Sequence, residues 1–438
     1  MVHELDGLAI KGVVRFPNRR SPPRMASHPA VAFSSVDRAA GRLVVWLCLI
    51  GVLIPAADVL FYVAGAKFTV GRLAVAALLI PAIITMVRGR KLLTADVLAL
   101  ALGAWMLIAA IEVGGRATIS SAGAESLEFV AGYFAARAFI YGPVALSDFA
   151  GGLKVVLVLV ILMATVEHAT GRLVVHEMFA SAFHTIPPDA QFRNGFVRAM
   201  ATFDHAILFG AFCAFCGIIL LYANPNPFKR AFWVGLAAYG CLLSLSSSAV
   251  MAIVIAIAIF IFDRTMWRYP WRWGLLWSLA ALPLLGLSAV SQHPLHWIIS
   301  HLTYDPVSGF FRLMIWDGAI EKIGQSPLVG YGFHLLGNEI LDATVDSVWL
   351  VSALRFGVPA VVLLILVSIA AWRSVPHKPS GHPAIVVMER MSTGFTMVLG
   401  MYMFVGLTVH FWNYMWIFWG ICIGTRASVR EWFLTYAR

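Results

Sequence analysis

The sequence has little charge for its length. Only 12% of its 438 residues are charged, whereas 60% are hydrophobic, and the mean hydropathy of +0.83 is far above that of soluble proteins. No polar segment between the apolar runs is long enough to form a soluble domain. We therefore predict an all-α, polytopic integral membrane protein, in which apolar runs such as residues 43–63 and 358–372 cross the bilayer as helices.

Cysteine is absent from the polar segments. The five cysteines lie in apolar runs, and Cys213 and Cys216, although they have the spacing of a redox motif, have no cationic neighbour that would activate a thiol. We interpret all five as small hydrophobic residues. The thirteen histidines show no metal-binding pattern either, so we predict neither a metal site nor a cofactor.

The net charge of +10 does not indicate a nucleic-acid partner, because the basic residues collect in short connections and in the tails. Such a distribution reports membrane topology, with basic residues on the cytoplasmic side. The predicted cytoplasmic connections carry Arg88, Arg90, Lys91, Lys229, Arg230, Arg264, Arg268, Arg272, Arg373 and Lys378. Residues 1–42 are basic and polar, without a cleavable signal, and are predicted to be a disordered cytoplasmic tail.

The apolar runs predict twelve transmembrane helices. We place them at residues 43–63, 68–87, 96–113, 124–146, 149–169, 202–223, 231–245, 247–263, 274–290, 346–372, 387–409 and 411–425. The organisation is then a tail (1–42), nine helices (43–290) with a loop near 171–201, a long loop with short amphipathic helices (291–345), three helices (346–425) and a second cytoplasmic tail (426–438).

Strict alternation of these helices places both long loops on the exterior or periplasmic side of the membrane and both termini in the cytoplasm. The exterior or periplasmic side has no pool of ATP or nucleotide sugars. A reaction there must therefore use a substrate that is already carried on a lipid or secreted, and it must draw its energy from the leaving group of that substrate.

The first long loop brings two arginines to the start of the sixth predicted helix. Arg193 and Arg198 could hold phosphate oxygens bidentately, although arginines at a membrane interface also extend toward lipid headgroups. Asp204 and His205 enter the helix itself. Ionisable groups there are functional candidates, with a local ion pair or a helix cap as the alternative.

The second long loop carries apolar residues at helical spacing over residues 310–323. This pattern predicts a short amphipathic helix on the membrane face, capped by Ser308, with Arg312 in its first turn. An arginine there opposes the helix dipole, so a nearby anion explains it, and an ordinary surface arginine is the alternative. The glycine-rich strip over 327–337 could wrap around a ligand. Trp316 and Tyr331 offer flat faces for sugar rings, as do aromatic residues of a membrane interface.

Several of these stretches together resemble the O-antigen ligase and polymerase family of membrane glycan transferases. They are Arg198 to His205, Ser244 to Ser248 (SLSSS), Arg312 to Trp316 (RLMIW), Pro327 to Gly332 (PLVGYG), and Asp346-Ser347 with Gly357 ten residues after the serine. They run in this order through most of the chain.

The resemblance implies an undecaprenyl-pyrophosphate-linked glycan donor and a glycan or lipid-linked acceptor, with other polysaccharide-export proteins as further partners. Arg198 and Arg312 match the arginines that hold the pyrophosphate. Arg193, His205, Ser347, Tyr331 and Trp316 are the further candidates for substrate contact. The expected activity is that of a metal-independent glycosyltransferase, in exopolysaccharide biosynthesis or O-antigen assembly.

Asp346 departs from the pattern, because the ligase motif has a histidine at this position. A carboxylate can act as the base that removes the acceptor's proton, but an aspartate here could equally cap the following helix. The departure favours a polymerase over a lipopolysaccharide ligase. The alternative from another class is a transporter or flippase for a lipid-linked or anionic solute, which would return its substrate unchanged.

Overall fold

The computed structural model describes residues 35–63, 66–266, 268–269, 271–290, 306–374 and 382–436. Most of the predicted N-terminal tail, the first part of the predicted 291–345 loop and Lys378 lie outside these ranges. The chain divides into two units, Met1–Ala40 and Gly41–Arg438. All the sites described below lie in the second unit.

The described part of the second unit is almost entirely helical. In chain order, the α-helices among the described residues are α1 (Ser35–Leu49), α2 (Val70–Gly89), α3 (Thr94–Gly114), α4 (Ile119–Phe139), α5 (Gly142–Thr170), α6 (Val174–Phe183), α7 (Ala206–Ala223), α8 (Pro227–Leu243), α9 (Ser247–Thr265), α10 (Arg272–Val290), α12 (Pro306–Gln325), α13 (Glu339–Thr344), α14 (Val348–Phe356), α15 (Val358–Trp372), α16 (Pro383–Val405) and α17 (Tyr414–Tyr436). Two short antiparallel hairpins complete it: β1 (Leu60–Val63) with β2 (Ala66–Thr69), and β3 (Phe192–Arg193) with β4 (Phe196–Val197).

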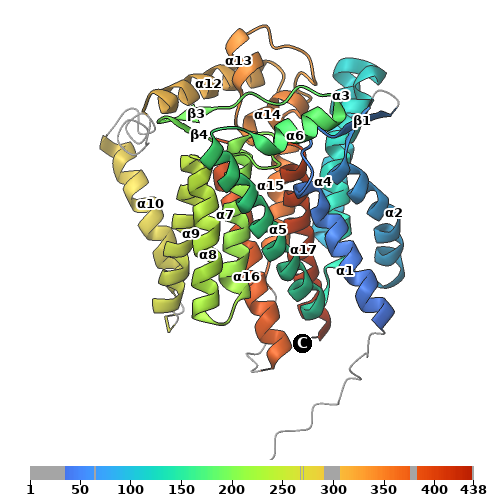
Figure 1. Cartoon of the computed structure of the whole chain (residues 1–438), viewed down its shortest axis with the longest axis vertical. Coiled ribbons are helices and arrows are strands. Elements are labelled where there is room, and N and C mark those ends of the chain that lie inside the picture. The colour runs from blue at the N-terminus through green and yellow to red at the C-terminus, as the bar shows by residue number, and fades with distance from the viewer. Residues whose placement is uncertain are drawn as a thin grey trace, which may run out of the picture. The chain divides into compact units, whose positions relative to one another are not determined.

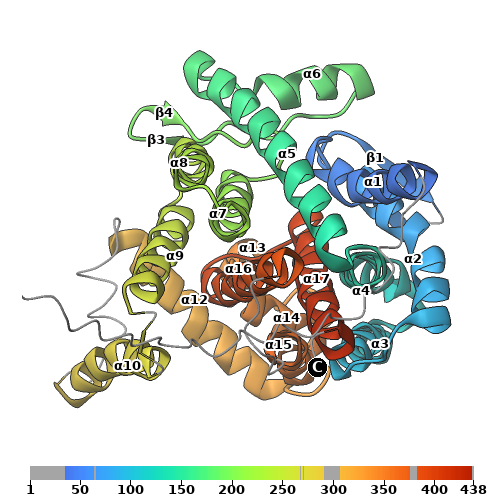
Figure 2. The ribbon, with the colours of Figure 1, turned by 90° about the horizontal axis from the view of Figure 1, so that it is seen from below.

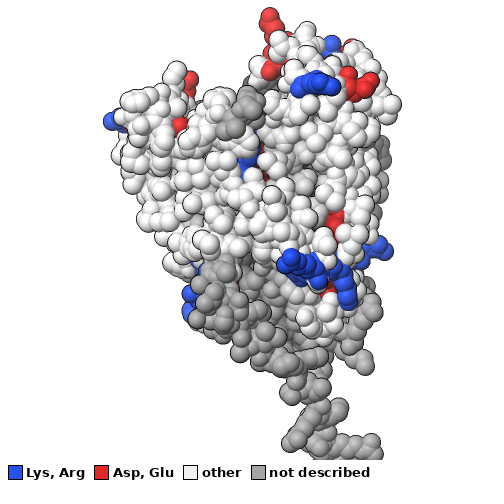
Figure 3. Space-filling model, turned by 90° about the vertical axis from the view of Figure 1, so that its right-hand side faces the viewer, with Lys and Arg blue, Asp and Glu red and all other residues white. Residues whose placement is uncertain are grey.

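Six helical segments of the described residues are long and apolar enough to cross a membrane: Val70–Gly89, Thr94–Phe139, Gly142–Thr170, Ala206–Ala223, Ser247–Thr265 and Pro383–Val405. Large apolar side chains such as Ile80 and Leu162 are exposed on them, as expected for a surface that faces lipid. Figure 3 shows a broad, mostly uncharged band between the charged ends of one face. The prediction of a helical membrane protein is thereby confirmed, whereas the number of twelve spans stays a prediction.

The first predicted span does not form one helix over residues 43–63. Helix α1 ends at Leu49 and is followed by a 3-10 turn (Ile50–Val52) and by the β1–β2 hairpin. Pro55 cannot continue the helical hydrogen bonds. Beyond it, Asp58 is fully buried and bonds His176 Nδ1 at 2.6 Å, so this segment is held by polar contacts with α6.

Three other predicted boundaries also shift. The span over 124–146 ends at Phe139, where α4 stops. The span over 346–372 is two helices, α14 and α15, separated by Gly357 at φ +78°, a backbone conformation that favours glycine. The predicted tail over 426–438 is helical as far as Tyr436, because α17 continues past residue 425 and buries Glu431.

The centre of the unit is formed by α17 packed against α4 (Figure 2). A Cβ atom at Gly132 of α4 would lie 2.6 Å from the Ile417 carbonyl oxygen of α17, so only glycine permits this approach. Small residues at helix contacts are typical of membrane proteins, where close packing replaces the hydrophobic effect between helices.

A buried ionic cluster joins α3, α4 and α17. Arg137 donates to the Asp96 carboxylate at 2.9 Å and to Glu431 at 2.5 Å, and Arg90 reaches Glu431 at 3.3 Å. Tyr133 donates its hydroxyl to Asp96 at 2.6 Å. Every charge in this cluster therefore has a partner of opposite sign within the protein.

The ends of the helices sort the loops into two groups. The hairpin β3–β4 and helices α6, α12 and α13 lie at the upper end in Figure 1. The connections α2–α3, α7–α8 and α9–α10, which carry predicted cytoplasmic basic residues, lie at the opposite end together with the C-terminal end of α17. The two polar loop regions, far apart in sequence, thus meet at one end of the bundle.

Candidate functional site

A cavity of about 220 Å³ opens at the upper end, where the two polar loop regions meet. We call it the arginine pocket. Its walls come from β3, α7, α9, α12, the connections beside them and the residues before α14. It is lined by Arg193, Arg198, His205, Ile207, Ser246, Ser247, Ser248, Arg312, Asp346, Thr408, Val409, His410 and Trp412. Of these described lining residues, three are arginines and one is a carboxylate.

Two of the arginines are oriented by the turn between α8 and α9. Arg193 donates from Nη1 to the Leu245 carbonyl at 2.7 Å, and Arg198 donates from Nε to the Ser244 carbonyl at 3.3 Å. Arg198 also donates to the side-chain oxygen of Gln191 at 2.9 Å. All three acceptors are neutral, so the contacts fix the guanidinium groups without cancelling their charge.

The N-terminus of α9 points into the same pocket. Ser247 begins the helix, and the N-cap residue Ser246 makes no side-chain capping bond. The first amides of a helix have no partner within it and carry a partial positive charge. The start of α9 therefore adds hydrogen-bond donors for an anion beside the arginines.

Arg312 reaches the arginine pocket from α12. The helix begins at Pro306, two residues before the predicted cap at Ser308, so Arg312 lies in the second turn and the prediction of a first-turn arginine was wrong. Its charge is nevertheless close enough to act on Arg198. Burial, together with the charges of Arg193 and Arg312, lowers the pKa of Arg198 to about 10, which keeps it cationic at neutral pH.

Asp346 is the acidic group of the arginine pocket. Its carboxylate is exposed to the pocket and forms no hydrogen bond or ion pair with the described residues. The N-cap of α14 is Ser347 rather than Asp346, so the alternative role as a helix cap has no geometric support. Desolvation raises the pKa of Asp346, and the nearby Arg312 guanidinium opposes this only in part.

His205 is the N-cap of α7. Its Nδ1 accepts from the Ile207 amide at 3.1 Å, so in the neutral ring Nε2 carries the hydrogen. Burial and the charge of Arg198 lower the pKa of His205 to about 4. At neutral pH this side chain can therefore donate a hydrogen bond, and it cannot serve as a base through Nδ1.

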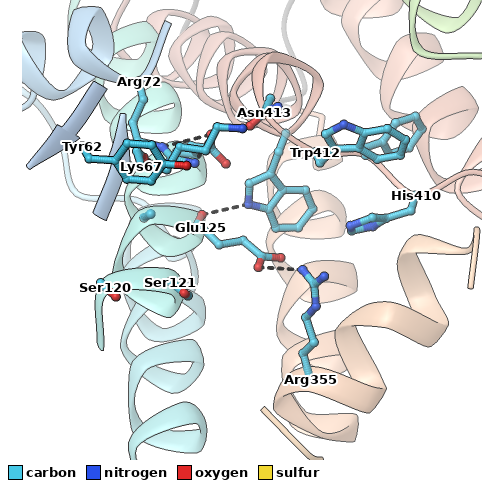
Figure 4. Close-up of a pocket in the computed structure, with 14 residues that line it drawn as sticks. Tyr62, Lys67, Arg72, Ser120, Ser121, Glu125, Arg355, His410, Trp412 and Asn413 are labelled. Atoms are coloured by element: carbon cyan, nitrogen blue, oxygen red, sulfur yellow. Dashed lines mark hydrogen bonds and ion pairs between the residues drawn. The ribbon is translucent and has the colours of Figure 1, made fainter. Parts of the chain in front are cut away.

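A second cavity of about 370 Å³ adjoins the first. We call it the mixed-charge pocket. It is lined by Tyr62, Lys67, Arg72, Ser120, Ser121, Ala124, Glu125, Glu128, Arg355, His410, Phe411, Trp412, Asn413 and Trp416. His410 and Trp412 line both cavities. Figure 4 shows them on the side opposite Tyr62 and Lys67.

The carboxylates of the mixed-charge pocket are already paired. Glu128 accepts from Arg72 at 2.7 Å, and Glu125 accepts from Arg355 at 3.0 Å. The two pockets therefore differ in charge although they share a wall.

Residues 231–365 match the protein-family model described as O-antigen ligase. These residues are thus similar to O-antigen ligases, and we call them the O-antigen ligase domain. No curated protein matches the chain. The resemblance seen in the sequence is thereby confirmed, and it supports a membrane glycan ligase or polymerase, a glycosyltransferase-like enzyme.

The O-antigen ligase domain spans α8 to α15 and contributes only part of the arginine pocket. It supplies the serine turn, Arg312 and Asp346, whereas Arg198 precedes it and His410 follows it. The fold brings these separate segments together, so Arg198 and Arg312, which the resemblance pairs, line the same cavity.

Three predicted substrate-contacting residues lie outside the pockets. Ser347 is buried and donates to the Gly406 carbonyl at 3.0 Å. Tyr331 donates its hydroxyl to the Lys322 carbonyl at 2.9 Å. Trp316 packs with Tyr331 against the small core of α12, α13 and α14. The contacts of Tyr331 and Trp316 lie within the O-antigen ligase domain, whereas Ser347 ties this domain to the connection after α16.

The glycine-rich strip also has a structural explanation. The Tyr331 amide donates to the Leu354 carbonyl at 2.6 Å and Gly332 donates to Arg355 at 3.0 Å. A Cβ atom at Gly357 would overlap the Leu328 carbonyl. The strip thus packs on the end of α14 and does not line either pocket, contrary to the expectation that it wraps around a ligand.

The sequence analysis missed His410 and Trp412. Both lie in the connection between α16 and α17, residues 406–413, which was assigned to two spans. This connection is tied to the start of α14, because Val348 donates its amide to the Gly406 and Val409 carbonyls at 3.1 Å. In the sequence, their role is indicated only by the presence of a histidine and a tryptophan between two helices.

Proposed function

We propose that this chain is a membrane glycosyltransferase that moves glycan from an undecaprenyl-pyrophosphate-linked donor to a hydroxyl of a glycan acceptor. The single observation that carries the proposal is the arginine pocket, where Arg193, Arg198, Arg312 and the start of α9 face a common cavity. Together they form a site for a doubly charged group such as a pyrophosphate.

The reaction belongs on the outer, periplasmic face of the inner membrane. The basic connections lie at the end of the bundle opposite the pockets, and basic connections favour the cytoplasm. On this assignment the donor enters from the outer leaflet with its pyrophosphate at the level of the arginine pocket and its lipid tail in the bilayer.

The transfer replaces one bond to the anomeric carbon by another. The bond between that carbon and the pyrophosphate oxygen breaks, and the acceptor oxygen forms the new one. Negative charge develops on the leaving pyrophosphate, where fixed cations stabilise the transition state most. His205 can donate a hydrogen bond from Nε2 to the same group.

Asp346 is the proposed base that takes the proton of the acceptor hydroxyl. Its carboxylate is accessible in the pocket, and its raised pKa makes it a better proton acceptor than an ordinary surface aspartate. Because it stands where the related ligases carry a histidine, we favour polymerisation of a polysaccharide over ligation to lipopolysaccharide.

The test uses the purified full-length protein in lipid nanodiscs, with lipid-linked oligosaccharide isolated from the source membranes as donor and acceptor. Elongation is followed by gel analysis of the glycan. We expect Arg198→Ala, Arg312→Ala and Asp346→Ala each to lower elongation strongly. The matched controls Arg172→Ala and Asp189→Ala alter exposed residues outside the pockets and are expected to elongate normally.

Elongation at the wild-type rate in all three pocket variants would contradict the assignment of the site. A substrate that crosses the membrane without any change in glycan length would instead support the transporter alternative.

A further inference from the structure

We propose that the mixed-charge pocket binds the acceptor sugar and presents its hydroxyl to the arginine pocket past His410 and Trp412. This inference rests on the proposed function, because it assumes that the arginine pocket holds the donor. It assigns the acceptor to a cavity formed largely by β1, β2, α4 and the α16–α17 connection, most of which lies outside the O-antigen ligase domain.

The size and position of the cavity fit this role. Its volume of about 370 Å³ lies within the range of small-molecule sites, roughly 300–1,000 Å³. It shares His410 and Trp412 with the arginine pocket. A sugar in the one pocket is therefore separated from an anion in the other only by these side chains.

The lining has the chemistry of a carbohydrate site. Tyr62, Trp412 and Trp416 provide aromatic surfaces, and Ser120 and Ser121 provide hydroxyl groups. Figure 4 shows Ser120 and Ser121 on one helix, beneath the Glu125–Arg355 pair. Such a mixture of flat apolar faces and hydrogen-bonding groups suits a sugar ring.

The charge difference between the pockets separates donor from acceptor. In the mixed-charge pocket Arg72 and Arg355 are each held by a carboxylate. In the arginine pocket Arg193 and Arg198 donate only to neutral oxygens in the described chain. A pyrophosphate therefore prefers the arginine pocket, and the mixed-charge pocket is left to a ligand that needs no strong cation, such as the acceptor sugar.

His410 is placed to orient the acceptor hydroxyl. Among the described residues neither ring nitrogen forms a hydrogen bond, and Nδ1 is fully buried. The ring lies beside Trp412, with 5.6 Å between the centroids, and Trp412 in turn lies 6.3 Å from His205. Burial and the charge of Arg355 lower the pKa of His410 to about 3, so the neutral ring can exchange a hydrogen bond with a sugar.

The backbone links this histidine to the proposed base. Ser347 and Val348, which directly follow Asp346, bond the carbonyls of Gly406 and Val409. His410 and Asp346 line the same cavity, so a hydroxyl that contacts His410 enters the cavity that holds the Asp346 carboxylate. Its proton goes to Asp346, and its oxygen forms the bond to the anomeric carbon as the pyrophosphate leaves.

The decisive experiment separates acceptor from donor. Mild acid releases the oligosaccharide from its lipid pyrophosphate, and the free oligosaccharide can act as an acceptor but not as a donor. Its KM is measured with lipid-linked oligosaccharide as donor. Binding of undecaprenyl pyrophosphate is measured separately on the same nanodisc preparations.

Ala124→Trp fills the mixed-charge pocket, because Ala124 lines it on α4. We expect the acceptor KM to rise about tenfold or more, with unchanged affinity for undecaprenyl pyrophosphate. The matched control is Ala117→Trp, the same substitution at an exposed residue that lies outside both pockets, and it is expected to behave as wild type.

His410→Gln keeps the side chain polar and of similar size, so it guards against misfolding of the tryptophan variant. We expect it to lower kcat/KM for the free oligosaccharide without weakening undecaprenyl pyrophosphate binding. An unchanged acceptor KM in Ala124→Trp, or unchanged kcat/KM in His410→Gln, would overturn this inference alone. Unchanged pyrophosphate binding in Arg198→Ala and Arg312→Ala would instead overturn the proposed function.

Discussion

Arginines occur in two very different settings in this protein. In the buried cluster of α3, α4 and α17, Arg137 meets two carboxylates at 2.9 and 2.5 Å. In the arginine pocket, Arg193 and Arg198 meet only neutral oxygens within the described chain, and the lone lining carboxylate, Asp346, is not bonded to them. The first group of charges is complete within the protein, whereas we propose that the second binds an anion from outside.

The comparison separates charges that hold the fold from charges that bind a ligand. A buried charge whose partner is lost destabilises the protein strongly. Burial, and after it the charges of Arg193 and Arg312, lower the pKa of Arg198, so the protein without a ligand disfavours this charge. Removal of Arg198 should therefore cost binding but not stability. The following changes test this distinction, from the largest expected effect to the smallest.

Arg137→Ala should destabilise the protein by about 3–5 kcal/mol, because it leaves Asp96 and Glu431 buried without their main partner. The measurement is thermal unfolding in detergent micelles. Arg198→Ala serves as the comparison and should unfold at or above the wild-type temperature. Equal destabilisation by both substitutions would mean that the two settings do not differ as described.

Arg198→Ala and Arg312→Ala should each weaken the binding of undecaprenyl pyrophosphate by on the order of 100-fold, the effect of losing about 3 kcal/mol of charge-assisted bonding. Arg198→Lys should recover only part of this, because a lysine keeps the charge but loses the planar fork. The affinities are measured by microscale thermophoresis. Full recovery by lysine would show that charge alone, without guanidinium geometry, determines binding.

The pH dependence of transfer should show an acid limb set by Asp346. Activity falls as pH decreases through the raised pKa of this carboxyl, because the protonated form cannot accept a proton. Arg312→Gln removes the cation that lowers the Asp346 pKa, so the limb should move to higher pH in the residual activity. The profile is recorded at saturating donor. A limb that moves to lower pH, or stays in place, would argue against Asp346 as the base.

Substitution of His176 should have the smallest effect on binding, because His176 only positions the loop that carries Arg198. Its ring bonds two acceptors, Asp58 at 2.6 Å and the Phe203 carbonyl at 3.0 Å, which requires both nitrogens to be protonated. Although burial lowers the pKa of His176, the Asp58 carboxylate raises it above its usual value. The bonds are therefore complete below the usual histidine pKa and are lost as pH rises through the raised one.

His176→Gln should weaken undecaprenyl pyrophosphate binding severalfold, by about 1 kcal/mol, and should remove the loss of affinity at alkaline pH. Binding titrations at several pH values give this directly. If the variant still loses affinity at alkaline pH as the wild type does, His176 is not the source of that loss.

The sequence predicted the helices well where apolar runs were uninterrupted, and it failed where polar contacts replace them. Helices α2, α3 and α9 lie within a few residues of the expected spans. The first predicted span does not continue as a helix after Leu49, because Asp58 is buried against His176. These two residues are far apart in the chain. No local pattern could show that partner.

For the site, the resemblance to the O-antigen ligase and polymerase family implied that Arg198 and Arg312 belong together. The residue types in the two polar loops were not enough to separate ligand-facing from structural residues. Ser347, Tyr331 and Trp316 looked like sugar ligands because of their chemistry, but their bonds and packing are internal. His410 was missed because its place beside both pockets depends on how the connection after α16 folds onto the start of α14.

Whether the arginine pocket holds the donor is tested most directly by a cryo-electron microscopy structure of the full-length protein in nanodiscs with undecaprenyl pyrophosphate bound. We expect density for the pyrophosphate within hydrogen-bond distance of Arg198 and Arg312, at the start of α9. Pyrophosphate density away from these two arginines, with the arginine pocket empty, would contradict it.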